Sequence, residues 1–397
     1  MTTSNDWRIK PIKEFTQVIT GGTPSTMNKE YWENGTVPWL PSGDLKDCRI
    51  TKAHKFITKK GLDNSAAKMM PIGTVLIALT GATTGQTGLL DIESTANQSV
   101  TGILPSDEHI PEYLFYYLQT LRGKIIKQSY GGAQKHISQE FVKNIQITLP
   151  PLGTQKQIVK ILEKAEDLIK LRTMSTNLTK NLQAALFHEM FGNPKNNPNR
   201  LKSGKIRDLV LEANYGIGKK GTEDKGNYPL LRMNNITYTG EWDLTSLQYV
   251  DLTPDEVKRY TVKEGELLFN RTNSKELVGK CAVFRGKQPM AFAGYLVKLK
   301  TANKATSEYI AAYLNSSYGK AQLLNRAKNI VGMANINAQE VQEIPILIPD
   351  NDAVLIKFAD SVKSLENLKR LQKESKNEID NLFSSLLNRM LKGEIVC

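Results

Sequence analysis

Apolar residues recur at intervals of three and four in two stretches of the chain, residues 152–192 and 350–397. This spacing places apolar side chains on one stripe of an α-helix, and it continues for about 40 residues each time. The residues expected to pack along the two stripes are Ile158, Ile161, Leu168, Leu182, Leu186, Phe358, Val362, Leu365, Leu382 and Leu386. A lone helix cannot bury such a stripe, whereas two helices can bury theirs against each other. We therefore predict an intramolecular antiparallel coiled coil, with dimerisation through these helices as the alternative.

The residues that precede each long stripe show a different pattern. Short β-type runs, such as residues 74–79 and 295–300, are bounded by clusters of Gly, Pro and Asn. Short helical patterns, such as residues 112–121, interrupt them. These patterns predict an α+β fold with two tandem mixed α/β domains, each followed by one of the long helices.

The second half of the chain repeats the first about 200 residues further on. The clearest matches are NLQAALFHEMF (181–191) with NLFSSLLNRML (381–391), HISQEFVKNIQITLP (136–150) with NINAQEVQEIPILIP (335–349), and PIGTVLI (71–77) with KEGELLF (263–269). A polar interruption at residues 172–177 also has a counterpart at 372–377, and we interpret both as solvated surface. Duplication of one unit explains these matches and predicts pseudo-twofold symmetry.

The repeat and the breaker-rich run GNPKNNPN together predict where the parts of the chain begin and end. The predicted parts are a first mixed domain (1–151), the first long helix (152–192), a linker (193–204), a second mixed domain (205–349) and the second long helix (350–397).

Composition excludes several classes of protein. At 397 residues, 40% hydrophobic and 23% charged, the chain resembles a globular protein of two or three domains. It has no apolar run of the roughly 18 residues that a membrane-spanning helix needs, and its first residues do not resemble a signal peptide, so we expect a cytoplasmic protein. Three Cys and four His residues, widely spaced, predict neither disulfides nor a metal site.

The net charge of +13 favours a polyanionic partner such as DNA, and the surplus is largest in residues 200–349. The alternative is a surplus that serves solubility alone. Catalytic signatures are missing: there is no phosphate-binding G-x-x-x-x-G-K-[ST] and no N-P-P-[FY] or D-P-P-[FY] tetrapeptide of the kind that N-methyltransferases use on a flipped base. The acidic and basic residues of PDEVK (254–258) are too crowded for a typical nuclease metal site. We interpret the chain as a protein that recognises DNA and not as an enzyme.

Loops rich in Thr, Asn, Gln, Lys and Arg follow corresponding predicted strands in both halves, and such side chains bind phosphates and base edges. Candidate DNA-binding residues in the first half are Thr23, Ser25, Ser42, Lys46, Thr83, Thr84, Gln86 and Lys135. Those in the second half are Lys219, Lys220, Arg232, Asn234, Asn235, Arg271, Asn273 and Lys275. For each of them an ordinary solvated loop side chain is the alternative. The predicted loops include GGAQKH (131–136) and NRAKN (325–329).

These residues resemble the specificity (S) subunits of type I restriction–modification systems over the whole chain. The segments that carry the resemblance are GGTPST (21–26), VPWLPSGDL (37–45), PIGTVLIALTGATTG (71–85), NIQITLPPLGTQKQIVKILEK (144–164) and KEGELLFNRTNSKELVGK (263–280). The second junction, IPILIPDNDAVLIKFADSV (344–362), departs from the pattern because it lacks the second proline and the Gln-Lys pair.

The resemblance implies a non-catalytic subunit with two target-recognition domains, each reading one half of a bipartite, asymmetric site in double-stranded DNA. It implies that the long helices set the spacing between the halves and dock two methyltransferase subunits. S-adenosylmethionine, ATP and Mg²⁺ would then be bound only by partner subunits, including restriction subunits that translocate DNA. The alternative function is a stand-alone DNA-binding adaptor whose coiled coil recruits another partner.

Overall fold

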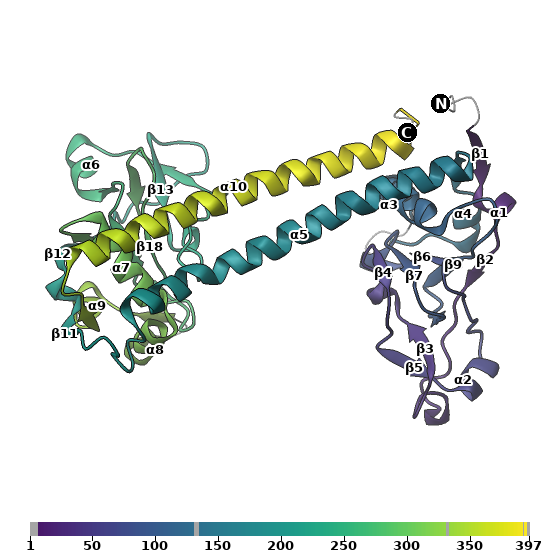
Figure 1. The fold of residues 1–397 in the computed structure, drawn as a ribbon, viewed down its shortest axis with the longest axis horizontal. Helices are drawn as coiled ribbons and strands as arrows, with labels where there is room; N and C mark the ends of the chain where they lie inside the picture. The colour runs from purple at the N-terminus through teal and green to yellow at the C-terminus, as the bar shows by residue number, and fades with distance from the viewer. Residues whose placement is uncertain (1–6, 131–134, 331–332, 392, 395–397) are drawn as a thin grey trace. The chain divides into compact units, whose positions relative to one another are not determined.

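The structure is a computed structural model that describes residues 7–130, 135–330, 333–391 and 393–394 (Figure 1). The chain forms two compact units. Unit 1 comprises residues 1–172 and 375–397, and unit 2 comprises residues 173–374. Each unit therefore combines one mixed domain with half of each long helix.

Unit 1 is built on a five-stranded sheet with the order β2-β9-β6-β7-β4. Its strands are β2 (Val18–Thr20), β9 (Val100–Ile103), β6 (Val75–Ala78), β7 (Thr87–Leu90) and β4 (Cys48–Ile50). A second sheet joins β5 (Lys55–Ile57), β3 (Val37–Leu40) and β8 (Thr95–Ala96), and β1 (Arg8–Pro11) pairs with β10 (Gln146–Leu149). The helices are α1 (Ile12–Phe15), α2 (Lys59–Asp63), α3 (Pro111–Gln128) and α4 (Gln139–Lys143), with short 3₁₀ turns at Lys29–Tyr31, Ser42–Asp44 and Gly81–Thr83.

Unit 2 contains a four-stranded sheet with the order β12-β20-β16-β18. Its strands are β12 (Val210–Tyr215), β20 (Leu296–Thr301), β16 (Leu267–Asn270) and β18 (Cys281–Val283). The second sheet of unit 2 joins β14 (Gln248–Val250), β13 (Tyr228–Leu231), β19 (Met290–Phe292) and β15 (Thr261–Val262). A third sheet joins β17 (Thr272–Asn273), β22 (Met333–Asn335) and β21 (Lys328–Ile330). Finally, β11 (Lys202–Lys205) pairs with β23 (Pro345–Ile348). The helices are α6 (Pro254–Tyr260), α7 (Lys304–Asn315), α8 (Ser317–Arg326) and α9 (Ala338–Gln342), with 3₁₀ turns at Ile206–Asp208 and Met233–Asn235.

The predicted internal repeat is confirmed by shared strand pairings. In both main sheets a central strand, β6 or β16, pairs antiparallel with two strands. One of them, β9 or β20, precedes the helix α3 or α7, and the other, β7 or β18, follows a turn. In both second sheets one strand, β3 or β13, has an antiparallel and a parallel neighbour. The turns after β6 and β16 each end in a glycine with positive φ, Gly85 (77°) and Gly279 (80°), where a side chain would strain the backbone.

The central strands are buried on both faces, as their continuous apolar sequences require. In β6, Val75 and Ile77 join the core that contains α3, while Leu76 and Ala78 join the core beneath the second sheet. The alternation repeats in unit 2, where Leu267 and Phe269 face α7 and Leu268 faces the second sheet. The main sheet of each unit thus separates a helix layer from the second sheet.

The two long helices are α5 (Leu152–Phe191) and α10 (Asp352–Leu391). In unit 1, Ile158 and Leu162 of α5 belong to the same core as Met390 and Leu391 of α10. In unit 2, Phe187 and Phe191 of α5 belong to the same core as Phe358 of α10. The start of one helix therefore packs with the end of the other in each unit, so the predicted antiparallel pairing of α5 with α10 is confirmed (Figure 1).

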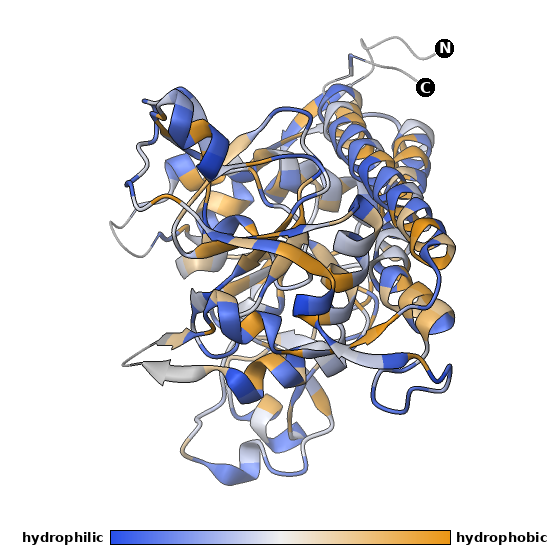
Figure 2. Cartoon of the chain, turned by 90° about the vertical axis from the view of Figure 1, so that its left-hand side faces the viewer, coloured by the Kyte–Doolittle hydropathy of each residue, from blue (hydrophilic) through white to orange (hydrophobic). Residues whose placement is uncertain are grey.

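The packing stripe itself differs from the prediction. Ile158, Phe358, Val362 and Leu365 are buried, and Ile161, Leu186 and Leu386 pack partly buried against the cores. Leu168, Leu182 and Leu382, by contrast, are 55%, 50% and 58% exposed. The prediction assumed that the helices bury apolar residues only against each other. In each unit the buried helix face also packs on the mixed domain, which leaves these leucines facing outward. Figure 2 accordingly shows hydrophobic residues interspersed with hydrophilic ones along the long helices.

The junctions into the two helices are held differently. Gln155 is buried, and its Nε2 donates to the carbonyls of Pro150 (2.8 Å) and Glu108 (3.2 Å), while its Oε1 accepts from the backbone N–H of Ile110 (2.8 Å). The corresponding Leu355 is part of the apolar core of unit 2. The last residues of the predicted linker, 202–204, belong to strand β11, because their backbone pairs with β23.

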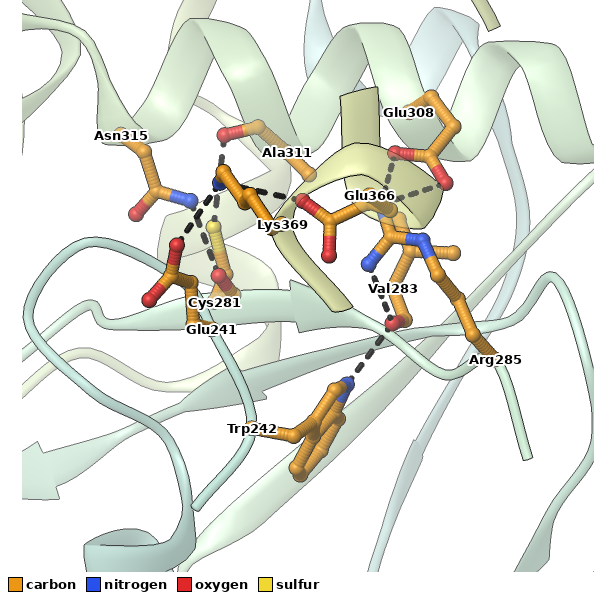
Figure 3. A network of polar contacts seen from close by, with 10 residues as sticks. All are labelled: Glu241, Trp242, Cys281, Val283, Arg285, Glu308, Ala311, Asn315, Glu366 and Lys369. Atoms are coloured by element: carbon orange, nitrogen blue, oxygen red, sulfur yellow. Dashed lines mark hydrogen bonds and ion pairs between the residues drawn. The ribbon is translucent and has the colours of Figure 1, made fainter. Parts of the chain in front are cut away.

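A polar network fastens α10 to the mixed domain of unit 2 (Figure 3). Nζ of Lys369 lies 2.7 Å from Oε1 of Glu241 and 3.1 Å from Oε1 of Glu366. The guanidinium of Arg285 donates to both carboxylate oxygens of Glu308 at 2.8 and 2.7 Å. Unit 1 has a counterpart, in which Arg49 lies 3.2 Å from Glu112 of α3 and 3.8 Å from Glu163 of α5.

Candidate nucleic-acid interface

In unit 2, Arg271 follows the central strand β16 and lies beside the exposed ring of Tyr215. Its guanidinium stacks over the ring of Tyr215 at 4.8 Å from the ring centre. Its backbone N–H donates to the carbonyl of Tyr295 at 3.0 Å, and both tyrosines are exposed. The Tyr215 hydroxyl accepts from the backbone N–H of Ala338, which holds the ring in place. An arginine whose guanidinium is held over an aromatic ring is suited to contact phosphates or bases.

A polar groove of about 520 Å³ begins at Tyr215. Its cationic lining comes from α6, the segment after it and β20, namely Lys258, Arg259, Lys263, Lys298 and Lys300. Two carboxylates offset part of this charge: Glu266 lies 3.7 Å from Lys298, and Glu212 lies 3.9 Å from Lys300. The groove remains positively charged overall, so it attracts an anionic backbone. We call Arg271, Tyr215 and this groove the basic edge of unit 2.

The residues after Arg271 begin a short strand and a turn. Thr272 and Asn273 form β17, which pairs with β22 in the register Thr272↔Asn335 and Asn273↔Ala334. Lys275 follows in the turn and is exposed. Asn273 is partly exposed and Lys275 is exposed, and both stay candidate DNA-binding residues close to Arg271 in the chain.

Unit 1 presents a different set of residues at the corresponding edge. Thr80, which follows β6, forms a bridge with His136, and His136 forms a second bridge with Tyr130. The rings of Tyr130 and His136 meet edge to face at 5.2 Å, and Tyr130 is exposed. Lys135 is exposed beside them, and Gln86 lies partly exposed after the glycine turn. The candidate loop GGAQKH lies partly outside the described residues, at 131–134.

A second polar groove of unit 2, of about 620 Å³, contains two further predicted residues, Arg232 and Asn234. Gln248 and Tyr249 of β14 also line it. Arg232 donates from Nη2 to the carbonyl of Ser246 at 3.2 Å, which fixes the guanidinium at the groove wall. Amide and guanidinium groups on one wall are suited to reading base edges.

Two predicted DNA-binding residues are buried and are used inside the protein. The Thr84 hydroxyl donates to the carbonyls of Gly81 (2.8 Å) and Lys135 (3.0 Å). The Asn235 side chain donates to the carbonyls of Asp243 and Ser246 and accepts from the N–H of Arg232. These predictions were wrong because small polar residues in turns often satisfy neighbouring backbone groups.

The remaining predicted residues lie on loops with varied surroundings. Lys219 pairs with Glu256 at 2.7 Å, and this hydrogen bond lowers the pKa of the glutamate. Thr23 hydrogen-bonds to Gln98, and Thr83 donates to the carbonyl of Thr80. The other candidates are Ser25, Lys46 and Lys220, which are exposed, and Ser42, which is partly exposed in a 3₁₀ turn.

Within the described ranges, no group of three or more His, Cys, Asp or Glu residues is placed to hold a metal ion. Among those same residues, no helix has the length and apolar character needed to cross a membrane.

Comparison with known families agrees with this duplicated arrangement. The type I restriction modification DNA specificity domain matches residues 4–180 and, a second time, residues 198–381. The chain belongs to this family. The two matches coincide with the two halves of the internal repeat, so the chain carries two tandem copies of the specificity domain.

Named relatives are specificity subunits of type I restriction enzymes. The EcoKI specificity subunit of Escherichia coli (strain K12) is 22% identical over 98% of this chain and 89% of its own. The MjaIX specificity subunit of Methanocaldococcus jannaschii is 29% identical, but the match spans 47% of this chain and 44% of that relative. A local match of this kind corresponds in length to a single specificity domain with its helix.

Solved structures share the fold of this specificity-domain protein. The S subunit of the type I restriction–modification system from M. genitalium has a TM-score of 0.58 and 14% identity over 98% of this chain and 99% of its own. A chain from a structure of complex assembly and conformational transition in the type I R-M system has a TM-score of 0.66 and 15% identity over 100% of both chains. At these identities the likeness concerns the fold alone.

Sequence reasoning missed the aromatic residues of the specificity domains. Tyr215, Tyr295 and Tyr130 were not candidates, although each adjoins a Gly- or Lys-rich loop. An aromatic residue beside a polar loop is more often a core residue than an exposed one, so the sequence signal was weak. The cationic residues of α6 and β20 were also missed, because they are distant in sequence from the loops.

Proposed function

We propose that this chain is the non-catalytic DNA-specificity subunit of a type I restriction–modification complex, with each specificity domain reading one half of a bipartite, asymmetric site. One observation carries the proposal: the two units repeat the same strand pairings but place different side chains at the same edge. Unit 2 presents Arg271 and Tyr215 there, whereas unit 1 presents Tyr130 and His136. Equal scaffolds with unequal edges are what a two-part, non-palindromic target requires.

The chemistry of the edges supports recognition of double-stranded DNA. The cationic groove beside Tyr215 is suited to the phosphate backbone, which supplies most of the affinity of such proteins. The Arg232 and Asn234 groove offers donors suited to base edges, which supply the specificity. Unit 1 is less charged at its edge, so we expect hydrogen bonding and stacking to contribute more to its half of the site.

The long helices supply a surface for partner subunits. In unit 2 an apolar groove of about 800 Å³ lies between α5 and α10, and the apolar residues that line it include Leu182, Leu186, Ile356, Leu365 and Leu368. Exposed apolar surface of this kind marks a protein interface. We propose that methyltransferase subunits dock on these helices, and that the helices set the distance between the two half-sites with pseudo-twofold symmetry.

The catalytic chemistry of the complex then belongs to its partners. Two methyltransferase subunits would bind S-adenosylmethionine and modify adenine, and restriction subunits would supply the ATP- and Mg²⁺-dependent steps. This division agrees with the lack of nucleotide-binding and methyltransferase motifs in the sequence. It also agrees with a cytoplasmic location, where such a complex meets DNA.

The decisive experiment is genome-wide mapping of methylated adenines in cells that express a partner methyltransferase with and without this chain. We expect one bipartite motif that appears only when the chain is present. Replacing residues 1–150 with the corresponding domain of another specificity subunit should change one half of the motif and leave the other intact. Loss of both halves, or methylation that does not depend on the chain, would contradict the proposal.

The second candidate is a stand-alone DNA-binding adaptor, which the exposed leucines of α5 and α10 also fit. Purification of the chain from its native cells separates the two functions. Stoichiometric recovery of an adenine methyltransferase supports the specificity subunit, whereas recovery of an unrelated protein with no methyltransferase supports the adaptor.

A further inference from the structure

In unit 2 the helix pair contains a buried polar contact, formed by Gln372 of α10 with Ser175 and Thr179 of α5. Gln372 is 4% exposed and Thr179 is 6% exposed. Nε2 of Gln372 donates to Oγ of Ser175 at 3.0 Å and to Oγ1 of Thr179 at 2.9 Å. The Thr179 hydroxyl donates in turn to the carbonyl of Ser175 at 2.9 Å, so its oxygen is oriented to accept. Residues 172–177 and 372–377 were predicted to be solvated surface. Gln372, which lies in the second of these segments, is instead buried, and so is Thr179, which follows the first. We call Gln372, Ser175 and Thr179 the polar layer.

The leucines next to this layer contribute little to the register of the helices, because they are exposed. Leu178 on α5 and Leu371 on α10 are 77% and 53% exposed, and Leu182 and Leu368 are also exposed. Leucines at intervals of three and four offer several axial registers of similar apolar content. The amide group of Gln372, by contrast, donates to two hydroxyls that α5 presents opposite it in the observed register. The polar layer thus discriminates between registers that the leucines do not.

The layer is also unlike its counterpart in the repeat. The positions that correspond to Gln372, Ser175 and Thr179 are Arg172, Ser375 and Ile379. The amide-to-hydroxyl layer therefore occurs once in the duplicated pair. A single buried polar residue is a known means of fixing the register of paired helices, and it is retained at a cost in stability that apolar replacement would recover.

We propose that Gln372, with Ser175 and Thr179, fixes the axial register of α5 against α10 and thereby the number of base pairs between the two half-sites. The inference rests on the proposed function, because the gap has a meaning only if the two specificity domains read one site. A slip by one helical turn moves one helix about 5.4 Å along the other, which corresponds to about one or two base pairs of duplex DNA. Gln372 is a positioning residue in this scheme, since it acts on DNA recognition only through the helices.

The first test measures register in the isolated chain. Spin labels are attached at two exposed positions of unit 2 through the substitutions Asn181→Cys and Asn367→Cys. Cys48→Ser and Cys397→Ser remove two native thiols, and Cys281 is kept because it is buried. Pulsed electron resonance should give a single label distance. The double variant Thr179→Val/Gln372→Leu should retain its helix content and melt at a higher temperature, yet give a second distance or a clearly broadened distribution. An unchanged single distance would overturn the proposal.

The second test measures the gap. The methyltransferase reconstituted with the double variant should methylate sites whose gap differs by one or two base pairs, in addition to native sites, with altered gaps making up about a tenth or more of the total. Thr179→Ser, which keeps the hydroxyl, and Lys373→Leu, at an exposed neighbouring position, should keep the native gap alone. Native gaps in every variant would overturn the proposal. If the wild-type complex methylates no bipartite site, the proposed function fails instead, and the label distances still decide the register.

Discussion

The internal repeat allows one ion pair to be compared with its own counterpart in a single protein. Glu308 of α7 and Glu112 of α3 occupy corresponding positions, and each lies beside an arginine. The Glu308 side chain is 10% exposed and that of Glu112 is 26% exposed, while Arg285 and Arg49 are 31% and 45% exposed. Burial raises the pKa of Glu308, and Arg285 offsets part of that rise. We therefore predict that Glu308→Ala destabilises its unit more than Glu112→Ala does.

The expected magnitudes follow from burial. Removal of one partner of a fully buried pair costs about 3 to 5 kcal/mol because it leaves a charge without compensation. Since Arg285 is partly exposed, we reduce the cost of Glu308→Ala to about 2 kcal/mol. Arg49 keeps its two hydrogen bonds to Asp91 at 2.7 and 3.0 Å, so Glu112→Ala should cost at most about 1 kcal/mol.

Hydrogen exchange of the whole chain can follow the two units separately, which a single unfolding curve cannot. A loss of about 2 kcal/mol should speed exchange of the most protected amides of α7 and β18 by about 30-fold. The double variant Arg285→Leu/Glu308→Leu should regain most of the lost protection, since no charge remains buried. Equal effects of Glu308→Ala and Glu112→Ala, or a double variant as unstable as the single one, would refute the reasoning.

Three further predictions concern pH, DNA binding and assembly. Burial lowers the pKa of His109 to about 4, whereas the pKa of an unfolded histidine is about 6.5. Between these two pH values the unfolded state binds more protons than the folded state. The free energy of unfolding of unit 1 should therefore fall by about 2 kcal/mol between pH 7 and pH 5. Urea unfolding at both pH values checks this, and a His109→Gln variant with the same pH dependence would argue against it. Arg271→Ala should weaken binding of the target duplex by about 1 to 3 kcal/mol, measured by titration at fixed salt. The control Thr84→Val should leave contacts to DNA intact, and equal losses of affinity in the two variants would exclude Arg271 from the interface. Leu368→Asp should abolish recovery of the methyltransferase in a pull-down while leaving the helix content measured by circular dichroism unchanged, and normal recovery would place the docking surface elsewhere.

The fold could be predicted to a large extent because the sequence contains an internal repeat, whose two copies can be compared with each other. The correspondence of residues 71–77 with 263–269 located the two central strands, β6 and β16, and the edge at which their following loops lie. The long helices were evident from apolar spacing, since few other structures keep that period for so many residues. The short strands of the second sheets were not predicted, because their two to four residues show no distinct periodicity.

The candidate site could be predicted only in outline. Periodicity identifies an apolar stripe but not what covers it, so Leu182 and Leu382 were assigned to the helix pair although they face outward. Turn residues such as Thr84 and Asn235 have the composition of DNA-binding loops, yet their hydrogen bonds stay within the protein. Tyr215 comes next to Arg271 only through the pairing of β12 with β20 and of β20 with β16, which no local pattern reveals.

The division of each long helix between two compact units has a consequence for synthesis on the ribosome. Unit 2 is continuous, so residues 173–374 can fold as soon as they emerge. The amino-terminal domain, although made first, lacks Met390 and Leu391 from its core until translation has passed residue 391. A nonsense codon in the final helical turns would thus damage the part of the protein that was translated earliest, and nascent chains must keep that domain soluble while more than two hundred further residues are added.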